Sequence, residues 1–165
     1  MSVFEKDEAR DESRLAKLEH ALRGEFRFWA EEKLRNADTD QFRHVNNAAI
    51  ATIFEAARME IFAPPAIRAL MGGANLAVVR LLIEFSAQLY FPGRVRVGST
   101  VVEVGHTSLQ VRQGLFGGDD VGRCATAEAI CVLVDERTGR PAPITPELRR
   151  YLLTSDSIAS AESLI

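Results

Sequence analysis

A ten-residue segment, from Asp38 to Asn47, gathers the side chains of this sequence that are best suited to chemistry. It holds two carboxylates (Asp38 and Asp40), an imidazole (His44) and the carboxamides of two adjacent asparagines (Asn46 and Asn47). A long, mostly apolar segment follows it directly. Polar groups this dense, placed just before a segment that is expected to be buried, indicate a reaction centre more than a surface loop.

The apolar segment that follows, Asn47 to Phe62, predicts a helix. Apolar residues occur on nearly every face of such a helix, so we expect protein to surround it. Pro64-Pro65 is expected to end it, because proline cannot continue the backbone ladder. The polar exceptions on this helix are Thr52, Glu55, Arg58 and Glu60.

The start of this helix suggests the kind of chemistry. Asn46 or Asn47 is a suitable N-cap residue. The first backbone N–H groups of a helix lack partners within it and carry the positive end of its dipole, so they can bind an anion or a developing oxyanion. Asp40 lies seven residues before Asn47 and is expected to face the same cavity. A carboxylate beside an oxyanion site fits acyl transfer or hydrolysis.

Composition narrows the class of protein. The chain has 165 residues, 47% of them hydrophobic and 26% charged, which predicts one globular domain. A net charge of −3 gives no support to nucleic-acid binding. We expect no membrane span, no secretory signal and no metal site. Cys124 and Cys131 should lie on opposite faces of one strand as reduced core residues, which predicts a cytoplasmic protein.

The remaining pattern predicts an α+β architecture. We expect a charged arm over 1–22, partly helical or disordered, one domain over 23–153 and a tail over 154–165. Short connections between strands require antiparallel pairing. One curved antiparallel sheet would then wrap around one long buried helix, and its uncovered edges favour a dimer or higher oligomer. The expected strands are 26–36, 76–91, 94–104, 107–116 and 121–134, with a short helix at 146–153.

These residues also match a known family pattern. The segment Arg35 to Asn47 reads R-x-x-D-T-D-x-x-x-H-V-N-N, and Ile53 to Arg58 reads I-F-E-A-A-R. Weaker support comes from Val134 to Pro141. Over about residues 26–153 the chain resembles the hotdog-fold acyl-CoA thioesterases of the 4-hydroxybenzoyl-CoA thioesterase type.

The resemblance implies hydrolysis of an acyl-CoA thioester to the free acid and CoA. It implies that Asp40 is the nucleophile or the general base, and that the backbone N–H at Asn47 polarises the thioester carbonyl. His44 would orient Asp40, bind substrate or be structural. The active site would lie between the subunits of a homodimer, often paired into a homotetramer. No separate cofactor is expected, because CoA is part of the substrate, and its phosphates would contact the turn at His106, Thr107 and Ser108.

The sequence departs from the family pattern at Arg43, where many relatives carry glycine. Pointing inward, Arg43 could pair with Asp38 or Asp40, or touch a carboxylate or hydroxyl of the acyl group. Pointing outward, it would change only the loop. Ile50 stands where tyrosine is frequent, and the expected CoA turn lacks clustered arginines.

Structural explanations compete with catalytic ones at several positions. We expect Asp38 to bond the loop backbone, Asn46 to cap the helix, and Glu55 and Arg58 to form an ion pair.

Two other functions are possible on this fold. An enoyl-CoA hydratase would need histidine five residues after aspartate, whereas His44 follows Asp38 by six and Asp40 by four. A non-catalytic acyl-CoA-binding module would bind substrate without releasing thiol.

Overall fold

The structure is a computed structural model that describes residues 24–117 and 122–154, together with positions 13, 16, 17, 20 and 22. The rest of the predicted arm, the turn at 118–121 and the tail beyond Thr154 lie outside the described residues. The elements are β1 (Phe28–Lys33), the 3-10 helix η1 (Asn36–Asp38), α2 (Asn47–Glu60), α3 (Pro65–Leu70), β2 (Ala74–Phe85), β3 (Arg94–Val104), β4 (Ser108–Gly117), β5 (Gly122–Asp135) and α4 (Pro146–Leu153).

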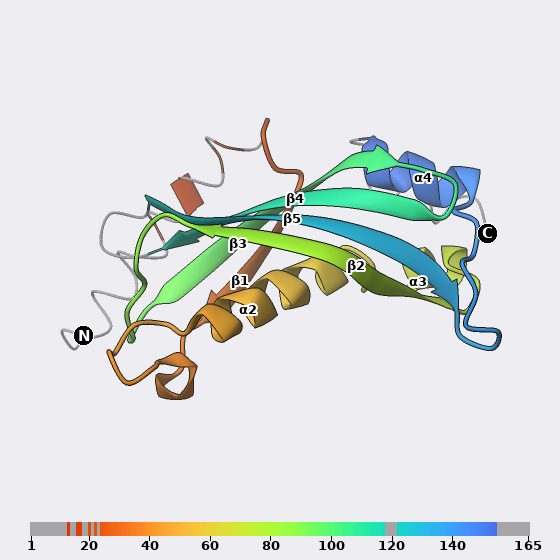
Figure 1. Ribbon diagram of the computed structural model, residues 1–165. Coiled ribbons are helices and arrows are strands. Elements are labelled where there is room, and N and C mark those ends of the chain that lie inside the picture. Colours follow the sequence, from red (N-terminus) through yellow and green to blue (C-terminus); the bar gives the residue numbers. More distant parts are fainter. Residues whose placement is uncertain are drawn as a thin grey trace. The chain divides into compact units, whose positions relative to one another are not determined.

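The five strands form one antiparallel sheet in the order β1-β3-β4-β5-β2, with α2 packed against it (Figure 1). β1 pairs with β3 in a register that sets Phe28 opposite Ser99 and Lys33 opposite Arg94. This arrangement confirms the predicted α+β hotdog architecture, a curved antiparallel sheet around one long helix. β1 and β2 are the edge strands.

Contacts between residues divide the chain into two compact units. The first comprises 1–58, 83–100 and 113–127, and the second comprises 59–82, 101–112 and 128–165. The polar segment and most of α2 therefore belong to the first unit, and the predicted CoA turn belongs to the second.

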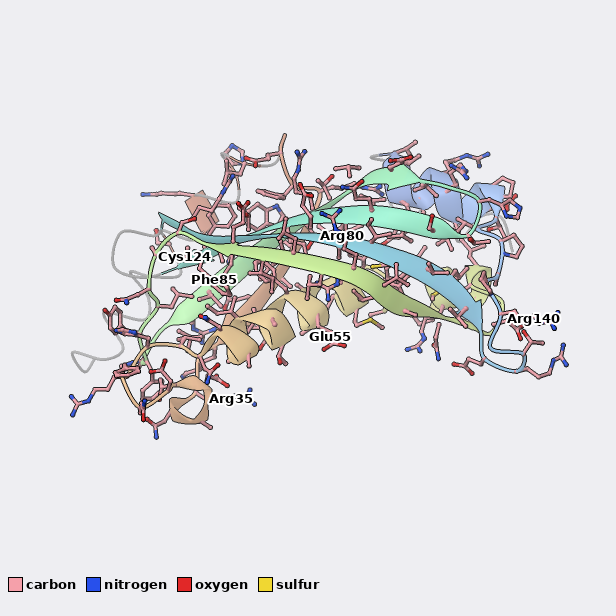
Figure 2. All side chains as sticks on the ribbon, in the orientation of Figure 1. Arg35, Glu55, Arg80, Phe85, Cys124 and Arg140 are labelled. Atoms are coloured by element: carbon pink, nitrogen blue, oxygen red, sulfur yellow. The ribbon has the colours of Figure 1, made fainter. Side chains whose placement is uncertain are left out.

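The core of the first unit lies between α2 and the sheet. Ile50, Ile53, Phe54 and Ala57 of α2 pack in one apolar cluster with strand residues that include Val95, Val97, Leu115, Ala125 and Ala127. The expectation that α2 is buried all round was wrong for this chain: its other face is exposed, and Glu55 on that face is labelled in Figure 2. Thr52, Glu55 and Glu60 explain the difference, since their polar groups are more stable in water.

A buried polar group interrupts this core at the end of α2. Arg58 is 2% exposed and donates from Nη1 to Oε1 of Gln113 at 2.8 Å. Gln113 in turn donates to the Phe54 carbonyl at 3.1 Å and to Oγ of Ser99 at 3.0 Å. These bonds offset the cost of burying polar groups in an apolar core.

In the second unit, two prolines begin helices. Pro65 is the first residue of α3, a helix that the sequence pattern did not predict. Pro146 begins α4 as predicted, and Oγ1 of Thr145 caps it by accepting the N–H of Leu148 at 3.2 Å. Both cysteines are buried and neither is in a disulfide bond, in agreement with the expectation of reduced core residues.

Candidate functional site

An ion pair between Arg35 and Asp38 holds the turn at the start of the polar segment. The Asp38 carboxylate accepts the Arg35 backbone N–H at 2.7 Å and bonds the Arg35 guanidinium at 3.0 Å. The side-chain hydrogen bond from Arg35 lowers the pKa of Asp38 below its ordinary value. The Asp38 carbonyl also accepts the N–H of Asn46 at 2.7 Å. Asp38 therefore has the structural task that the sequence analysis expected.

Asp40 is partly buried and is held by the loop that it helps to form. Its Oδ1 accepts the N–H of Phe42 at 2.8 Å and the N–H of His44 at 3.3 Å. Its backbone N–H donates to the His44 carbonyl at 2.9 Å. One carboxylate oxygen is thus anchored, which fixes the direction in which the other points.

His44 lies beside a second loop, which connects β2 and β3. It forms an isolated β-bridge with Tyr90, and the two rings meet edge to face at 5.1 Å between centroids. The N–H of Val45 donates to the Leu89 carbonyl at 2.8 Å. Tyr90, which is 53% exposed, could not be found from the sequence, because nothing in the pattern links it to His44.

The start of α2 follows the polar loop as predicted. Oδ1 of Asn46 accepts the N–H of Ala48 at 2.8 Å, so Asn46 is the cap. α2 begins at Asn47, which is exposed. Within the described part of the chain, no acceptor is bonded to the N–H of Asn47. This helix start therefore has the free donor that an oxyanion site needs.

The predicted CoA turn connects β3 and β4 in the second unit. The N–H of Gly105 donates to the Ser108 carbonyl at 2.7 Å, and the His106 carbonyl accepts the N–H of Ile144 at 2.8 Å. The His106 side chain is exposed, while Thr107 and Ser108 are partly buried.

An arginine of α4 supports this turn. The Arg149 guanidinium donates to the Val104 carbonyl and, at 2.6 Å, to the Gly105 carbonyl. Arg149 also lines a shallow pocket with Arg150 and Thr154. The turn itself lacks clustered arginines, and the sequence pattern does not predict one supplied by α4.

Neither a metal site nor a membrane span is evident in the residues that the structure describes. No three His, Cys, Asp or Glu side chains among them are grouped so as to hold a metal ion. No helix in the described ranges is long and apolar enough to cross a membrane.

Comparisons with known proteins agree with the fold. Residues 34–152 match the family model described as the Thioesterase-like superfamily. Comparison with curated proteins gave no match.

Solved structures with a similar fold come from several bacteria. A thioesterase from Thermus thermophilus, complexed with coenzyme A and zinc, is 26% identical with a TM-score of 0.67, over 77% of this chain and 92% of that one. A predicted thioesterase from Bacillus stearothermophilus is 25% identical with a TM-score of 0.67, over 79% of this chain and 98% of that one. A thioesterase-superfamily protein from Jannaschia is 19% identical with a TM-score of 0.71, over 85% and 91%, and shows the fold alone.

The family match extends from the end of β1 to α4 and includes the whole polar segment. This chain therefore belongs to the Thioesterase-like superfamily and is a thioester hydrolase.

Proposed function

We propose that this thioester hydrolase is an acyl-CoA thioesterase of the 4-hydroxybenzoyl-CoA thioesterase type, which converts an acyl-CoA to the free acid and CoA. One observation carries the proposal: a carboxylate anchored through one oxygen, Asp40, precedes a helix whose first N–H, at Asn47, is available. The coenzyme A in the related Thermus thermophilus structure supports CoA as the carrier.

In the proposed reaction, the Asn47 N–H donates to the thioester oxygen as it becomes negative. Asp40 then acts in one of two ways. As general base, it takes a proton from water, whose oxygen attacks the carbonyl carbon; the C–S bond breaks, and the proton passes to the leaving thiolate. As nucleophile, Asp40 attacks the carbon itself and expels the thiolate, and water hydrolyses the resulting anhydride. His44, whose backbone bonds Asp40, orients it or contacts substrate.

The remaining contacts follow from the family resemblance. His106, Thr107 and Ser108 would contact the CoA phosphates, with Arg149 holding the turn in place. The reaction as proposed uses no cofactor or metal, since CoA belongs to the substrate. The cytoplasmic location expected from the sequence remains part of the proposal.

We further propose that the enzyme is a homodimer, or a tetramer of two such dimers, with its active sites between subunits. The edge strand β2 supports this, because within the described ranges no strand pairs with its outer edge, and it exposes apolar side chains. These are Val78, Val79, Leu81, Leu82 and Phe85, each between 39% and 62% exposed. Arg80 and Phe85 of this strand are labelled in Figure 2.

Release of free thiol from a panel of short, medium, long-chain and aromatic acyl-CoAs tests the reaction. Asp40→Asn should lower kcat by about 10²–10⁴-fold, because the amide keeps an oxygen for the two backbone N–H groups but cannot serve as base or nucleophile. Asp135→Asn, at the last residue of β5, is the matched control and should keep wild-type turnover. The buried cysteines add little background to the assay. Unchanged turnover in Asp40→Asn would remove Asp40 from the mechanism.

A second variant tests the helix start. Asn47→Pro removes the backbone N–H at the first helical position, where proline is tolerated. We expect kcat to fall by about 10²–10³-fold, as for the loss of one oxyanion donor. Asn47→Ala keeps the N–H and should retain most activity. Equal losses in the two variants would assign the role to the side chain instead.

A further inference from the structure

Arg43 is, within the described chain, the one residue other than glycine with a positive backbone φ, at 68°. This left-handed conformation brings Cβ close to the carbonyl oxygen, a conflict that glycine avoids. A residue with a side chain held in this strained conformation points to a use for that side chain.

The same turn that imposes this conformation also holds the proposed catalytic carboxylate. The N–H of Arg43 donates to the Asp40 carbonyl at 3.0 Å, and the N–H of Asp40 donates to the His44 carbonyl at 2.9 Å. Arg43 is thus fixed three residues from Asp40. Because consecutive Cα atoms are about 3.8 Å apart, the Cα atoms of Arg43 and Asp40 lie within roughly 11 Å of each other.

The two nearby carboxylates are engaged with other groups. Asp38 pairs with Arg35, and the anchored oxygen of Asp40 accepts two backbone N–H groups. The Arg43 side chain is exposed, and among the residues that the structure describes its guanidinium has no ion pair or hydrogen bond. An exposed guanidinium can bind a carboxylate or a phosphate through two parallel hydrogen bonds.

We propose that Arg43 is a specificity-determining residue that binds a carboxylate on the acyl group of the substrate. The inference rests on the proposed function, because it takes Asp40 as the group that acts on the thioester. The acyl group is joined directly to the reacting carbonyl, so a carboxylate at its end falls within reach of an arginine on the Asp40 turn. The phosphates of CoA lie at the other end of the long pantetheine arm. Substrates of this class are monothioesters of dicarboxylic acids.

Glutaryl-CoA and valeryl-CoA test this assignment, because they have equal chain lengths and differ in the terminal carboxylate. In Arg43→Gln, which keeps the backbone conformation and loses the charge, the ratio of kcat/KM for glutaryl-CoA to that for valeryl-CoA should fall about tenfold or more. Turnover of valeryl-CoA should stay within about twofold. Arg43→Lys should keep part of the preference. Arg68→Gln, an exposed arginine of α3, should leave the ratio unchanged.

The two substrates as N-acetylcysteamine thioesters, which lack the phosphates, separate the possible sources of the anion. If Arg43→Gln loses activity equally on both CoA substrates and regains it on the short thioesters, Arg43 binds phosphate and the assignment is overturned. An unchanged ratio overturns it as well. Absence of thiol release from every acyl-CoA by the wild type would instead overturn the proposed function, and this inference with it.

Arg43→Gly separates the charge from the strained backbone. It should lose the glutaryl preference to the same extent as Arg43→Gln. Its melting temperature should rise by a few degrees, because glycine relieves the strain at φ 68°. Gln41→Gly, two residues earlier in ordinary backbone, is the matched control and should melt at the same temperature or lower. A preference for glutaryl-CoA that survives in Arg43→Gly would contradict the role of the guanidinium.

Discussion

Asp38 and Asp40 are two residues apart, yet the loop gives them different surroundings. The Asp38 carboxylate forms an ion pair with the Arg35 guanidinium. This pair holds the 3-10 turn before the site. Among the residues that the structure describes, the Asp40 side chain accepts two backbone N–H groups through one oxygen and has no other hydrogen-bond or ion-pair partner. A carboxylate already paired with arginine is a poor base or nucleophile, so the electrostatics favour Asp40 for the chemistry.

The pairing of Asp38 predicts a pH-dependent contribution to stability. Its folded-state pKa is lowered, while that of the unfolded chain is about 3.9. The carboxylate therefore stabilises the fold above the unfolded pKa, and this contribution is lost as the pH falls through the folded pKa.

Asp38→Asn should accordingly be less stable than wild type in urea unfolding at about pH 7, and the gap should narrow as the pH falls below about 3.9 and through the lowered folded-state pKa. High salt should narrow the gap as well, because Arg35 is largely exposed. A gap that is constant over this pH range would show that the Asp38 charge does not contribute.

The role of a residue could be predicted from the sequence where its hydrogen-bonding partner is close in the chain. Asn46 as the cap and Asp38 as a loop-bonding residue were both expected, because each bonds a group within three residues of itself in the chain. The contact of His44 with Tyr90 was not predictable. It depends on two loops that are 46 positions apart and brought together by the sheet.

At the scale of elements, α2 combines an apolar face with a buried guanidinium. Gln113 of β4 connects Arg58, the Phe54 carbonyl and Ser99, and is itself 1% exposed. A bond to a charged donor is stronger than a neutral one, and leaving such a donor without its partner in a dry core is costly. The network therefore fixes how the end of α2 lies on β3 and β4.

We expect Gln113→Leu to lower the free energy of unfolding by about 2–4 kcal/mol, because leucine fills the space but removes three polar contacts. Gln110→Leu on the same strand is the matched control, since Gln110 is only partly buried, and should change it by less than about 1 kcal/mol. Chemical denaturation measures both. Similar losses in the two variants would show that the network adds nothing beyond strand propensity.

The sequence predicted elements best where alternation or turn residues marked them. The predicted bounds of β3 and α4 match the structure, because Val95 and Val97 alternate with arginines and Thr145-Pro146 marks a helix start. Phe26 was wrongly placed within a strand. It precedes β1, and its ring packs over Gly98, where an added Cβ would lie 2.5 Å from a ring atom. Such tertiary packing overrides a local pattern.

At the scale of the whole molecule, the sheet of the described residues ends at β2, which has no strand on its outer side. β2 is mostly exposed along its twelve residues, and several of its exposed side chains are apolar. A long, apolar edge strand would favour aggregation in a monomer unless something covers it. If β2 pairs with β2 of a second copy across a two-fold axis, the exposed β2 edge of each copy is covered.

A pair of valines with equal exposure tests this interface. Val78 on β2 and Val102 on β3 are each 41% exposed in the single chain. If β2 forms the dimer interface, Val78→Lys should bury an ammonium group there and shift the protein toward monomers in analytical ultracentrifugation, at a cost of several kcal/mol of association free energy. Val102→Lys adds the same charge to a strand inside the sheet and should leave the dimer intact.

If active sites form between subunits, thiol release should fall with dimer content in Val78→Lys and recover at high protein concentration. Full activity in a monomeric Val78→Lys would place the complete site within one chain.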